Sequence, residues 1–388
     1  MSSWRTYRIA DLGRVVTGKT PPSSQPELFD GPIPFITPSD MSFDHRHIST
    51  ERFVSVDWDR KQRTLLPEGA VCVVCIGATI GKICMSSKPS QTNQQINSVI
   101  VDQTRFDQGF VYFGLRTKAG ELMARAAGAA TPIINKTAFS EVEIDAPPLE
   151  TQRRIASILG AYDDLIEVNR RRIAVLEEMA RGLFEEWFVR FRFPGHEAVP
   201  ILDTPDGPVP EGWTWGTLGD LLSLPYGKAL KADARRPGDV AVIGSSGVVG
   251  SHVEALVSGP GIVVGRKGNV GSVIWSATDF WPIDTTYYVD TRLPLTYVYQ
   301  LLQRVPFENS HAAVPGLNRE YAMARVVLIA PDALVQRYGA FGEPLMDQIT
   351  TLERSNRSLA ASRDLLLPRL ISGQLSVAEA ARELEEAA

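Results

Sequence analysis

The stretch that decides the fold is WRTYRIADLGRVVTGKTPP (residues 4–22), because the chain carries a second version of it, WTWGTLGDLLSLPYGKALK (residues 213–231). The two versions align without a gap, and four further pairs of short motifs follow in the same order. Such a series indicates an internal duplication, which predicts two copies of one structural unit. The matched pairs are Trp4 with Trp213, Ile9 with Leu218, Asp11 with Asp220, Leu12 with Leu221, Gly18-Lys19 with Gly227-Lys228, TIGKI (79–83) with NVGSV (269–273), QIN (95–97) with PID (282–284), PIIN (132–135) with PGLN (315–318), and IDAP (144–147) with LIAP (328–331).

A long pattern of apolar residues at steps of three and four follows each repeat and predicts an amphipathic helix. The repeats themselves contain strand-like runs rich in β-branched residues, with helical stretches between them. The predicted fold class is therefore α/β: two α/β domains separated by two long antiparallel helices, with pseudo-two-fold internal symmetry. The first helical pattern has a main row (Ile155, Ile158, Tyr162, Leu165, Leu176, Met179, Leu183) and a neighbouring row (Leu159, Ile166, Ile173, Ala180, Trp187), and the second contains Leu345, Ile349, Leu352, Leu359, Leu366 and Leu370.

The domain organisation follows from the repeat and from a proline-rich segment that cannot continue a helix. That segment reads as a semi-rigid, extended connector. The end of the chain is acidic and is expected to form a short helix or a frayed tail. The predicted parts are a first globular domain (1–148), a first long helix (149–192), the linker (193–212), a second globular domain (213–333), a second long helix (334–376) and the C-terminal tail (377–388).

Asn169 interrupts the apolar stripe of the first long helix, and three arginines follow it. Asn356 occupies the equivalent heptad position in the second helix. Because a buried asparagine at such a position can fix the register of paired helices, we expect the two side chains to lie close together. Leu165 and Leu352 are expected to pair beside them. The arginines are balanced by nearby glutamates, so this helix is predicted to be a spacer and not a DNA-reading helix.

Composition limits the class of protein. The 44% hydrophobic and 22% charged fractions are ordinary for a globular chain. No apolar run approaches the roughly 20 residues needed to span a bilayer, and three cysteines argue against a disulfide scaffold. A cytoplasmic location is therefore expected. The net charge of −5 argues weakly against nucleic-acid binding, but the two globular domains are each nearly neutral, so a local basic face remains possible.

A search for catalytic motifs finds none that the sequence supports. CVVC (72–75) lies in an apolar strand pattern and is interpreted as buried structural thiols. GATIGK (77–82) and GRKGNVG (265–271) lack the spacing of nucleotide-binding loops and are interpreted as tight turns between strands. A duplicated scaffold without a catalytic constellation favours a recognition or assembly subunit over an enzyme.

The chain resembles the specificity subunits of type I restriction–modification systems. The resemblance covers essentially the whole chain and is carried by GKTPP (18–22), IPFITPSDM (33–41), GATIGKI (77–83), NQQINSVI (93–100), the run from Thr131 to Leu159, TPDGPVPEGW (204–213) and LLLPRLISGQL (365–375). The second half departs further from the family pattern.

The resemblance implies a non-catalytic subunit that binds double-stranded DNA. Each globular part would recognise half of a split sequence, and the long helices would separate them. The partners would be two methyltransferase (modification) subunits and, in the full complex, restriction subunits that translocate DNA. S-adenosylmethionine, ATP and Mg would belong to those partners, and no cofactor or metal is expected in this chain.

Side chains suited to bases and phosphates occur on the Gly- and Pro-rich loops of both repeats. The aromatic end of the first long helix is too apolar for a free surface, so it either packs on the second helix or docks a partner. The predicted DNA-binding residues are Lys19, Thr20, Ser39, Asp40, His45, Arg46, His47, Lys228, Lys231, Arg266, Lys267 and Asn269, and the predicted partner-docking residues are Phe184, Trp187 and Phe188.

Two other functions remain open from the residues alone. The near-neutral domains would also suit a paired-helix adaptor that binds no DNA. A self-contained methyltransferase–nuclease is disfavoured by the missing motifs. Salt-sensitive binding to duplex DNA would exclude the adaptor, because neutralising phosphates releases counterions.

Overall fold

The computed structural model describes residues 4–126, 132–205, 207–307 and 316–387. The chain forms two compact units: unit 1 joins Met1–Asn169 to Ser355–Ala388, and unit 2 is Arg170–Arg354. Each unit therefore contains one sequence repeat together with part of each long helix. Among the residues that the structure describes, no helix has the length and apolar character needed to cross a membrane.

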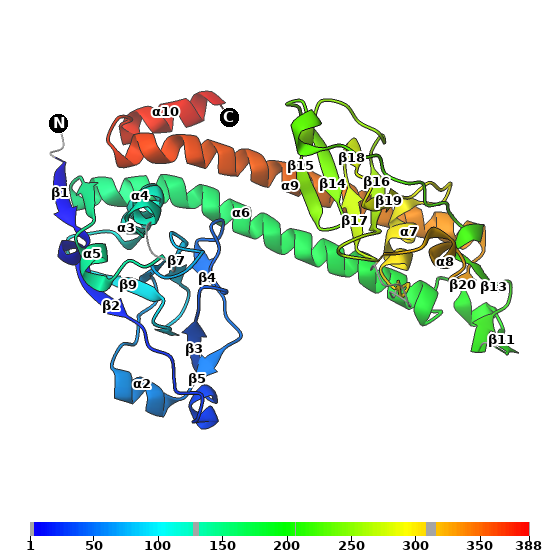
Figure 1. The fold of residues 1–388 in the computed structure, drawn as a ribbon, viewed down its shortest axis with the longest axis horizontal. Coiled ribbons are helices and arrows are strands. Elements are labelled where there is room, and N and C mark those ends of the chain that lie inside the picture. The colour runs from blue at the N-terminus through cyan, green and yellow to red at the C-terminus, as the bar shows by residue number, and fades with distance from the viewer. Residues whose placement is uncertain (1–3, 127–131, 206, 308–315, 388) are drawn as a thin grey trace. The chain divides into compact units, whose positions relative to one another are not determined.

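Unit 1 is a mixed α/β body (Figure 1). A five-stranded sheet has the order β2-β9-β6-β7-β4, a three-stranded sheet has the order β5-β3-β8, and β1 pairs with β10. The strands are β1 (Arg5–Arg8), β2 (Gly13–Thr17), β3 (Ile33–Ile36), β4 (His47–Ile48), β5 (Phe53–Val54), β6 (Val71–Val74), β7 (Ile83–Ser86), β8 (Gln91–Thr92), β9 (Ile96–Val101) and β10 (Glu143–Ala146). The short helices are α1 (Ile9–Leu12), α2 (Val56–Gln62), α3 (Gln108–Thr117), α4 (Ala119–Ala126), α5 (Lys136–Ser140) and α10 (Val377–Ala387).

Unit 2 has a similar mixture in smaller sheets. Their orders are β17-β16-β19, β15-β14-β18, β13-β20 and β11-β12. The strands are β11 (Ile201–Thr204), β12 (Gly207–Pro210), β13 (Thr214–Thr217), β14 (Val240–Gly244), β15 (Gly247–His252), β16 (Gly261–Gly265), β17 (Val273–Ser276), β18 (Phe280–Pro282), β19 (Thr286–Tyr288) and β20 (Val326–Ile329), and the short helices are α7 (Leu295–Leu302) and α8 (Arg319–Met323).

The predicted duplication is present in the backbone of the two units. Strand β1 pairs with β10 from Arg5 opposite Ala146, and β13 pairs with β20 from Thr214 opposite Ile329. In each repeat an aspartate caps the turn after the first strand: Asp11 accepts from the Arg8 amide at 3.0 Å, as Asp220 accepts from the Thr217 amide at 2.7 Å. The matching aspartates of the sequence are therefore local turn formers.

The same duplication explains the two asparagines in PIIN and PGLN. Asn135 accepts from the Ala138 amide at the start of α5, and Asn318 accepts from the Tyr321 amide at the start of α8. Both are helix N-caps, a position that favours asparagine.

One ladder differs between the repeats. The full β2–β9 pairing of unit 1 is reduced in unit 2 to two isolated bridges, Ser223 to Asp290 and Tyr226 to Tyr287. Pro225 lies between the bridging residues, and a proline cannot donate a ladder hydrogen bond. The degenerate sequence of the second repeat thus has a direct structural effect.

The two long helices are α6 (Leu149–Phe184), which continues as a π-helical turn (Glu185–Val189), and α9 (Asp332–Ile371). They pair antiparallel in each unit. In unit 1, Asn169 Nδ2 donates to Asn356 Oδ1 at 2.9 Å, and Arg363 Nη1 lies 2.5 Å from Asp163 Oδ1. The proximity expected for the two asparagines is therefore present, while their role in fixing the register stays a prediction.

The two apolar rows of α6, which were expected to form one wide stripe, are not buried equally. Leu159 and Ile166 are buried, whereas Leu165 is 45% exposed. Leu159 and Ile166 belong to the neighbouring row that steps by seven, while Ile155 of the first row is also buried. Leu165 was therefore wrongly assigned to helix pairing, because both rows are apolar and only the position of the second helix distinguishes them. Leu352, the other expected pairing residue, is partly buried in unit 2.

Changing Asn169 tests the register role. Asn169→Ala is expected to lower the free energy of unfolding by about 1 kcal/mol, since one hydrogen bond is lost. The double variant Asn169→Leu, Asn356→Leu should regain most of that loss but pair less uniquely, because the polar match is gone. Urea unfolding measures the first effect and amide exchange of α6 the second. Equal stability and exchange in all variants would exclude the role.

The aromatic end of α6 belongs to the core of unit 2. Phe184, Trp187 and Phe188 are 2%, 5% and 8% exposed, and Phe188 packs against Tyr297 with ring centroids 4.9 Å apart. Tyr338 of α9 also contacts all three rings. The partner-docking prediction for these residues is therefore wrong; the alternative, packing on the second helix, is what the structure has.

The linker contains more regular structure than expected, and the tail forms the helix that was one of its two expected forms. Strands β11 and β12 of the linker pair antiparallel, so this part is not simply an extended connector. The tail contains α10, and its Val377 and Ala380 are buried in the core of unit 1. Ala388 lies outside the described residues.

The segment that follows each long helix packs against the first matched tryptophan of a repeat. In unit 1 the backbone after α9 turns at Gly373 (φ +75°), whose Cβ position would lie 2.8 Å from the ring of Trp4. In unit 2 the backbone after α6 turns at Phe191 (φ +57°), and Phe193 stacks on Trp213 at 6.0 Å. The matched tryptophans thus fill equivalent places, and in unit 1 the last helices lie beside β1 (Figure 1).

Candidate nucleic-acid interface

Four loops of unit 1 meet at the ends of its strands. Because β3 and β8 are parallel, the residues after them, Thr37–Asp40 and Asn93–Gln95, leave the sheet side by side. Two further loops are hydrogen-bonded to them: the loop after β2, which contains Lys19 and Thr20, and the loop between β6 and β7, which contains Lys82. The connecting bonds are Asn93 N to Ile36 O at 3.1 Å, Lys19 N to Thr92 O at 2.9 Å, Thr20 Oγ1 to Gln94 Oε1 at 2.5 Å and Lys82 Nζ to Pro38 O at 3.2 Å.

The Gly-Lys pair of each repeat is explained by this packing. A Cβ on Gly18 would lie 2.2 Å from the carbonyl oxygen of Thr92, and a Cβ on Gly227 would lie 2.2 Å from that of Ile283. Only glycine allows so close an approach of two backbones. The lysine that follows, Lys19 or Lys228, is exposed beside the loop cluster. The motif therefore positions a cation at the same place in both repeats.

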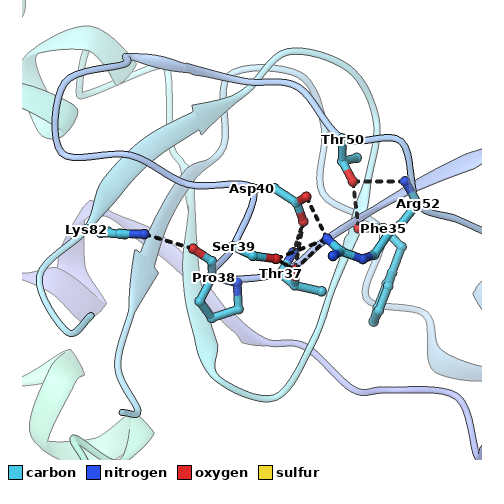
Figure 2. Close-up of polar contacts among 8 residues, drawn as sticks. All are labelled: Phe35, Thr37, Pro38, Ser39, Asp40, Thr50, Arg52 and Lys82. Atoms are coloured by element: carbon cyan, nitrogen blue, oxygen red, sulfur yellow. Dashed lines mark hydrogen bonds and ion pairs between the residues drawn. The ribbon is translucent and has the colours of Figure 1, made fainter. Parts of the chain in front are cut away.

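The loop after β3 is organised by its own side chains (Figure 2). Asp40 Oδ2 accepts from the Thr37 amide at 2.7 Å, and Asp40 Oδ1 pairs with Arg52 Nη1 at 2.7 Å. The same Arg52 atom donates to Ser39 Oγ at 3.1 Å. Asp40 is thus committed to holding the loop, whereas Ser39 remains exposed for contact.

Arg46 and its neighbouring histidines lie elsewhere in unit 1. The Arg46 guanidinium pairs with Asp164 of α6, and its Nε donates to His47 Nε2 at 2.9 Å. Burial lowers the pKa of His47 below its usual value, and the Arg46 charge adds to this shift against the opposing carboxylates of α6. The structure does not bring the exposed His45 or these two residues together with Lys19 and Ser39 through any contact among the described residues.

Unit 2 brings together the equivalent loops. Lys228 N donates to Pro282 O at 2.9 Å, and the amides of Arg266 and Lys267 both donate to Thr285 O at 2.9 and 3.0 Å. Leu317 N donates to Arg266 O at 2.8 Å, which adds the loop that leads to α8. Lys228, Lys267 and Asn269 are exposed in this cluster. Lys231 is also exposed but begins a separate 3-10 turn, Ala232–Ala234.

Tyr226 and Arg319 are candidate residues that the sequence analysis missed. Tyr226 is 51% exposed, and the guanidinium carbons of Arg266 and Arg319 lie 5.0 and 6.0 Å from its ring centroid. Such distances are those of cation–π contacts. Beside this arrangement lies an open groove of about 400 Å³ lined by Tyr226, Asn318, Arg319, Glu320 and Met323. A signal was available: Tyr226 directly precedes the matched Gly227-Lys228 pair.

The ring of Tyr287 packs against the ring of Tyr226. The two ring centroids are 5.1 Å apart, and the Tyr287 hydroxyl donates to Leu317 O at 2.8 Å. Burial, with a smaller contribution from Tyr226, raises the pKa of Tyr287 to about 12, so its phenol stays neutral near pH 7. In unit 1 the equivalent places hold Thr17 and Asn97, whose side chains are hydrogen-bonded at 2.6 Å.

The glycine-rich motifs and the cysteines have the structural roles predicted for them. GATIGK connects β6 to β7, and KGNVG connects β16 to β17. Cys72, Cys75 and Cys84 are buried free thiols, and burial raises the pKa of Cys75 to about 11. Among the described residues, no group of three His, Cys, Asp or Glu side chains is placed to hold a metal ion.

Comparisons with known proteins agree with one family. Residues 1–178 match the family model described as the type I restriction modification DNA specificity domain. The MjaIX specificity subunit of Methanocaldococcus jannaschii is 25% identical over 409 residues, which cover 97% of this chain and 94% of that protein. The HindI specificity subunit of Haemophilus influenzae is 35% identical over 167 residues, covering 40% of this chain and 35% of that protein.

A solved structure has the same fold. The S subunit of a type I restriction–modification system from M. genitalium superposes with a TM-score of 0.59 at 17% identity, covering 95% of this chain and 96% of that one. The mixed α/β class with two long helices, predicted from the repeat, is thereby confirmed. Residues 1–178 therefore match the type I restriction modification DNA specificity domain, and nearly the whole chain is similar to a specificity subunit of a type I restriction enzyme.

Proposed function

We propose that the chain recognises a bipartite DNA target, with one half-site for each repeat. The supporting observation is that both repeats place a corresponding set of loops at their strand ends, with different side chains on them. Unit 1 presents Lys19, Thr20 and Gln94 there, and unit 2 presents Lys228 and Arg266. Related scaffolds with unlike contact residues suit two unlike half-sites separated by unread base pairs.

Partner subunits would perform the chemistry. We propose two methyltransferase subunits, which use S-adenosylmethionine, and restriction subunits, which use ATP and Mg, in the full complex. Exposed apolar side chains on α6 favour contact with a partner: Leu165 and Val168 in unit 1, and Val175 (59% exposed) and Met179 (53% exposed) in unit 2. Apolar residues on one helix face typically dock a partner helix.

The test is the methylation pattern of a host genome. Co-expression of this chain with its modification partner is expected to methylate adenines at a split motif that is absent without the chain. Single-molecule sequencing of the genome measures this directly. A pattern that does not change when the chain is supplied would contradict the proposal.

The adaptor alternative is tested on the assembled complex. A DNA-binding complex should lose roughly 10³-fold or more in affinity for duplex DNA between 50 and 200 mM salt if it contacts six or more phosphates. Binding that is absent, or that does not respond to salt, would favour the adaptor.

A further inference from the structure

We propose that Arg266 selects a guanine in the half-site bound by unit 2, and that Tyr226 is the positioning residue that holds its guanidinium. This inference rests on the proposed function. The sequence placed Arg266 only among a set of candidate contacts, whereas the structure separates it from the lysines around it.

Arg266 is fixed at both its backbone and its side chain. Its amide donates to Thr285 O at 2.9 Å and its carbonyl accepts from Leu317 N at 2.8 Å. Its Nη1 donates to Asp284 O at 3.1 Å, and its guanidinium carbon lies 5.0 Å from the Tyr226 ring centroid. An arginine held in one orientation loses little side-chain entropy when it binds, which favours a contact of defined geometry.

The chemistry of the surroundings favours an acceptor-rich ligand. Arg319 lies over the same ring as Arg266, so two cations flank Tyr226, with the carboxylate of Glu320 on the same groove. Guanine presents two acceptors, O6 and N7, in the major groove, and arginine is the side chain that most often binds both. The exposed Lys228 and Lys267 suit phosphates instead, because a lysine binds as a flexible point charge.

Unit 1 lacks this arrangement. In the aligned repeat Thr17 takes the place of Tyr226, and Thr17 is already bonded to Asn97. Ile76 precedes the first turn where Arg266 precedes the second. The guanine requirement is therefore expected in one half-site only.

The experiment uses the assembled modification complex and duplexes carrying its methylation motif. Each guanine of the motif is replaced in turn by 7-deazaguanine, which removes only the N7 acceptor. With the unaltered chain, one such replacement in one half-site should weaken binding by roughly 5- to 150-fold. Arg266→Ala should abolish that difference, and the methylome should lose its guanine requirement at the same position.

Variants at Tyr226 and Lys228 complete the test. Tyr226→Phe keeps the ring and should keep the selection, whereas Tyr226→Ala should reduce it. Lys228→Ala is the matched control: it should weaken all duplexes alike and lower the salt slope by about 1. If Arg266→Ala left the 7-deazaguanine effect and the motif unchanged, or weakened all duplexes alike as Lys228→Ala does, the inference would be overturned.

A failure of the proposed function would give a different result from a failure of this inference. If the unaltered complex produced no split motif, the function itself would be wrong. A split motif that does not respond to any Arg266 variant would overturn the inference alone.

Discussion

Replacing Arg363 with methionine is expected to lower the free energy of unfolding by roughly 3–5 kcal/mol. Arg363 is 3% exposed and Asp163 is 7% exposed, and the guanidinium lies 2.5 Å from Asp163 Oδ1. The other carboxylate oxygen, Asp163 Oδ2, is buried without a partner among the described residues. Removing the arginine therefore leaves a carboxylate charge inside the helix pair with little to stabilise it. Urea unfolding of the purified chain measures the loss.

Two further variants make this result specific. Arg357→Met changes an exposed arginine of the same helix and should alter stability by about 0.5 kcal/mol or less. The double variant Asp163→Leu, Arg363→Met should recover most of the loss, because both charges are removed together. A single variant no less stable than Arg357→Met would mean that the pair contributes nothing.

Phe188→Ala is expected to cost about 3–5 kcal/mol, the usual range for removing a buried phenylalanine side chain. Phe188 packs against Tyr297, Tyr338 and Trp213, with ring centroids 4.9, 5.3 and 5.9 Å away. The neighbouring Val189 is 43% exposed, and Val189→Ala should have little effect.

This variant also distinguishes the core role from partner docking. Thermal unfolding of the isolated chain should already show the loss for Phe188→Ala, before any partner is added. A docking role predicts the opposite: unchanged stability of the chain and weakened assembly with the modification subunit.

The fold was predictable where one local pattern repeats. The matched residues Asp11 and Asp220 have the same turn-capping role, and the apolar steps located both long helices. Which row of α6 faces inward was not predictable, because Leu165 and Ile166 are both apolar. The buried pair of Asp163 and Arg363 was equally hidden, since each charge alone would be expected in water.

In the candidate interface, only the features set by residues adjacent in the sequence were predictable. Gly-Lys pairs and loop positions follow from adjacent residues, so Lys19 and Lys228 could be chosen. Arg46 looked equally suitable, yet its partner Asp164 is distant in the chain and turns it toward α6. Tyr226 was missed because its role depends on Arg266 and Arg319, which the fold brings to its ring from the end of β16 and the start of α8. The roles of both Arg46 and Tyr226 therefore depend on contacts with residues that are distant in the sequence.

The contact between Trp4 and the turn at Gly373 has a consequence for synthesis of the chain on the ribosome. The first segment of unit 1 is made before unit 2, yet Leu370 and Leu375, which belong to the same core, are made only after all of unit 2. Unit 2 is one continuous segment and can bury its aromatic core earlier. The usual order, in which the first domain folds first, is therefore inverted at the last step. Until the C-terminal residues emerge, the surface around Trp4, Ile155 and Leu159 lacks its cover, so a prematurely terminated chain would present that apolar surface to water and to chaperones.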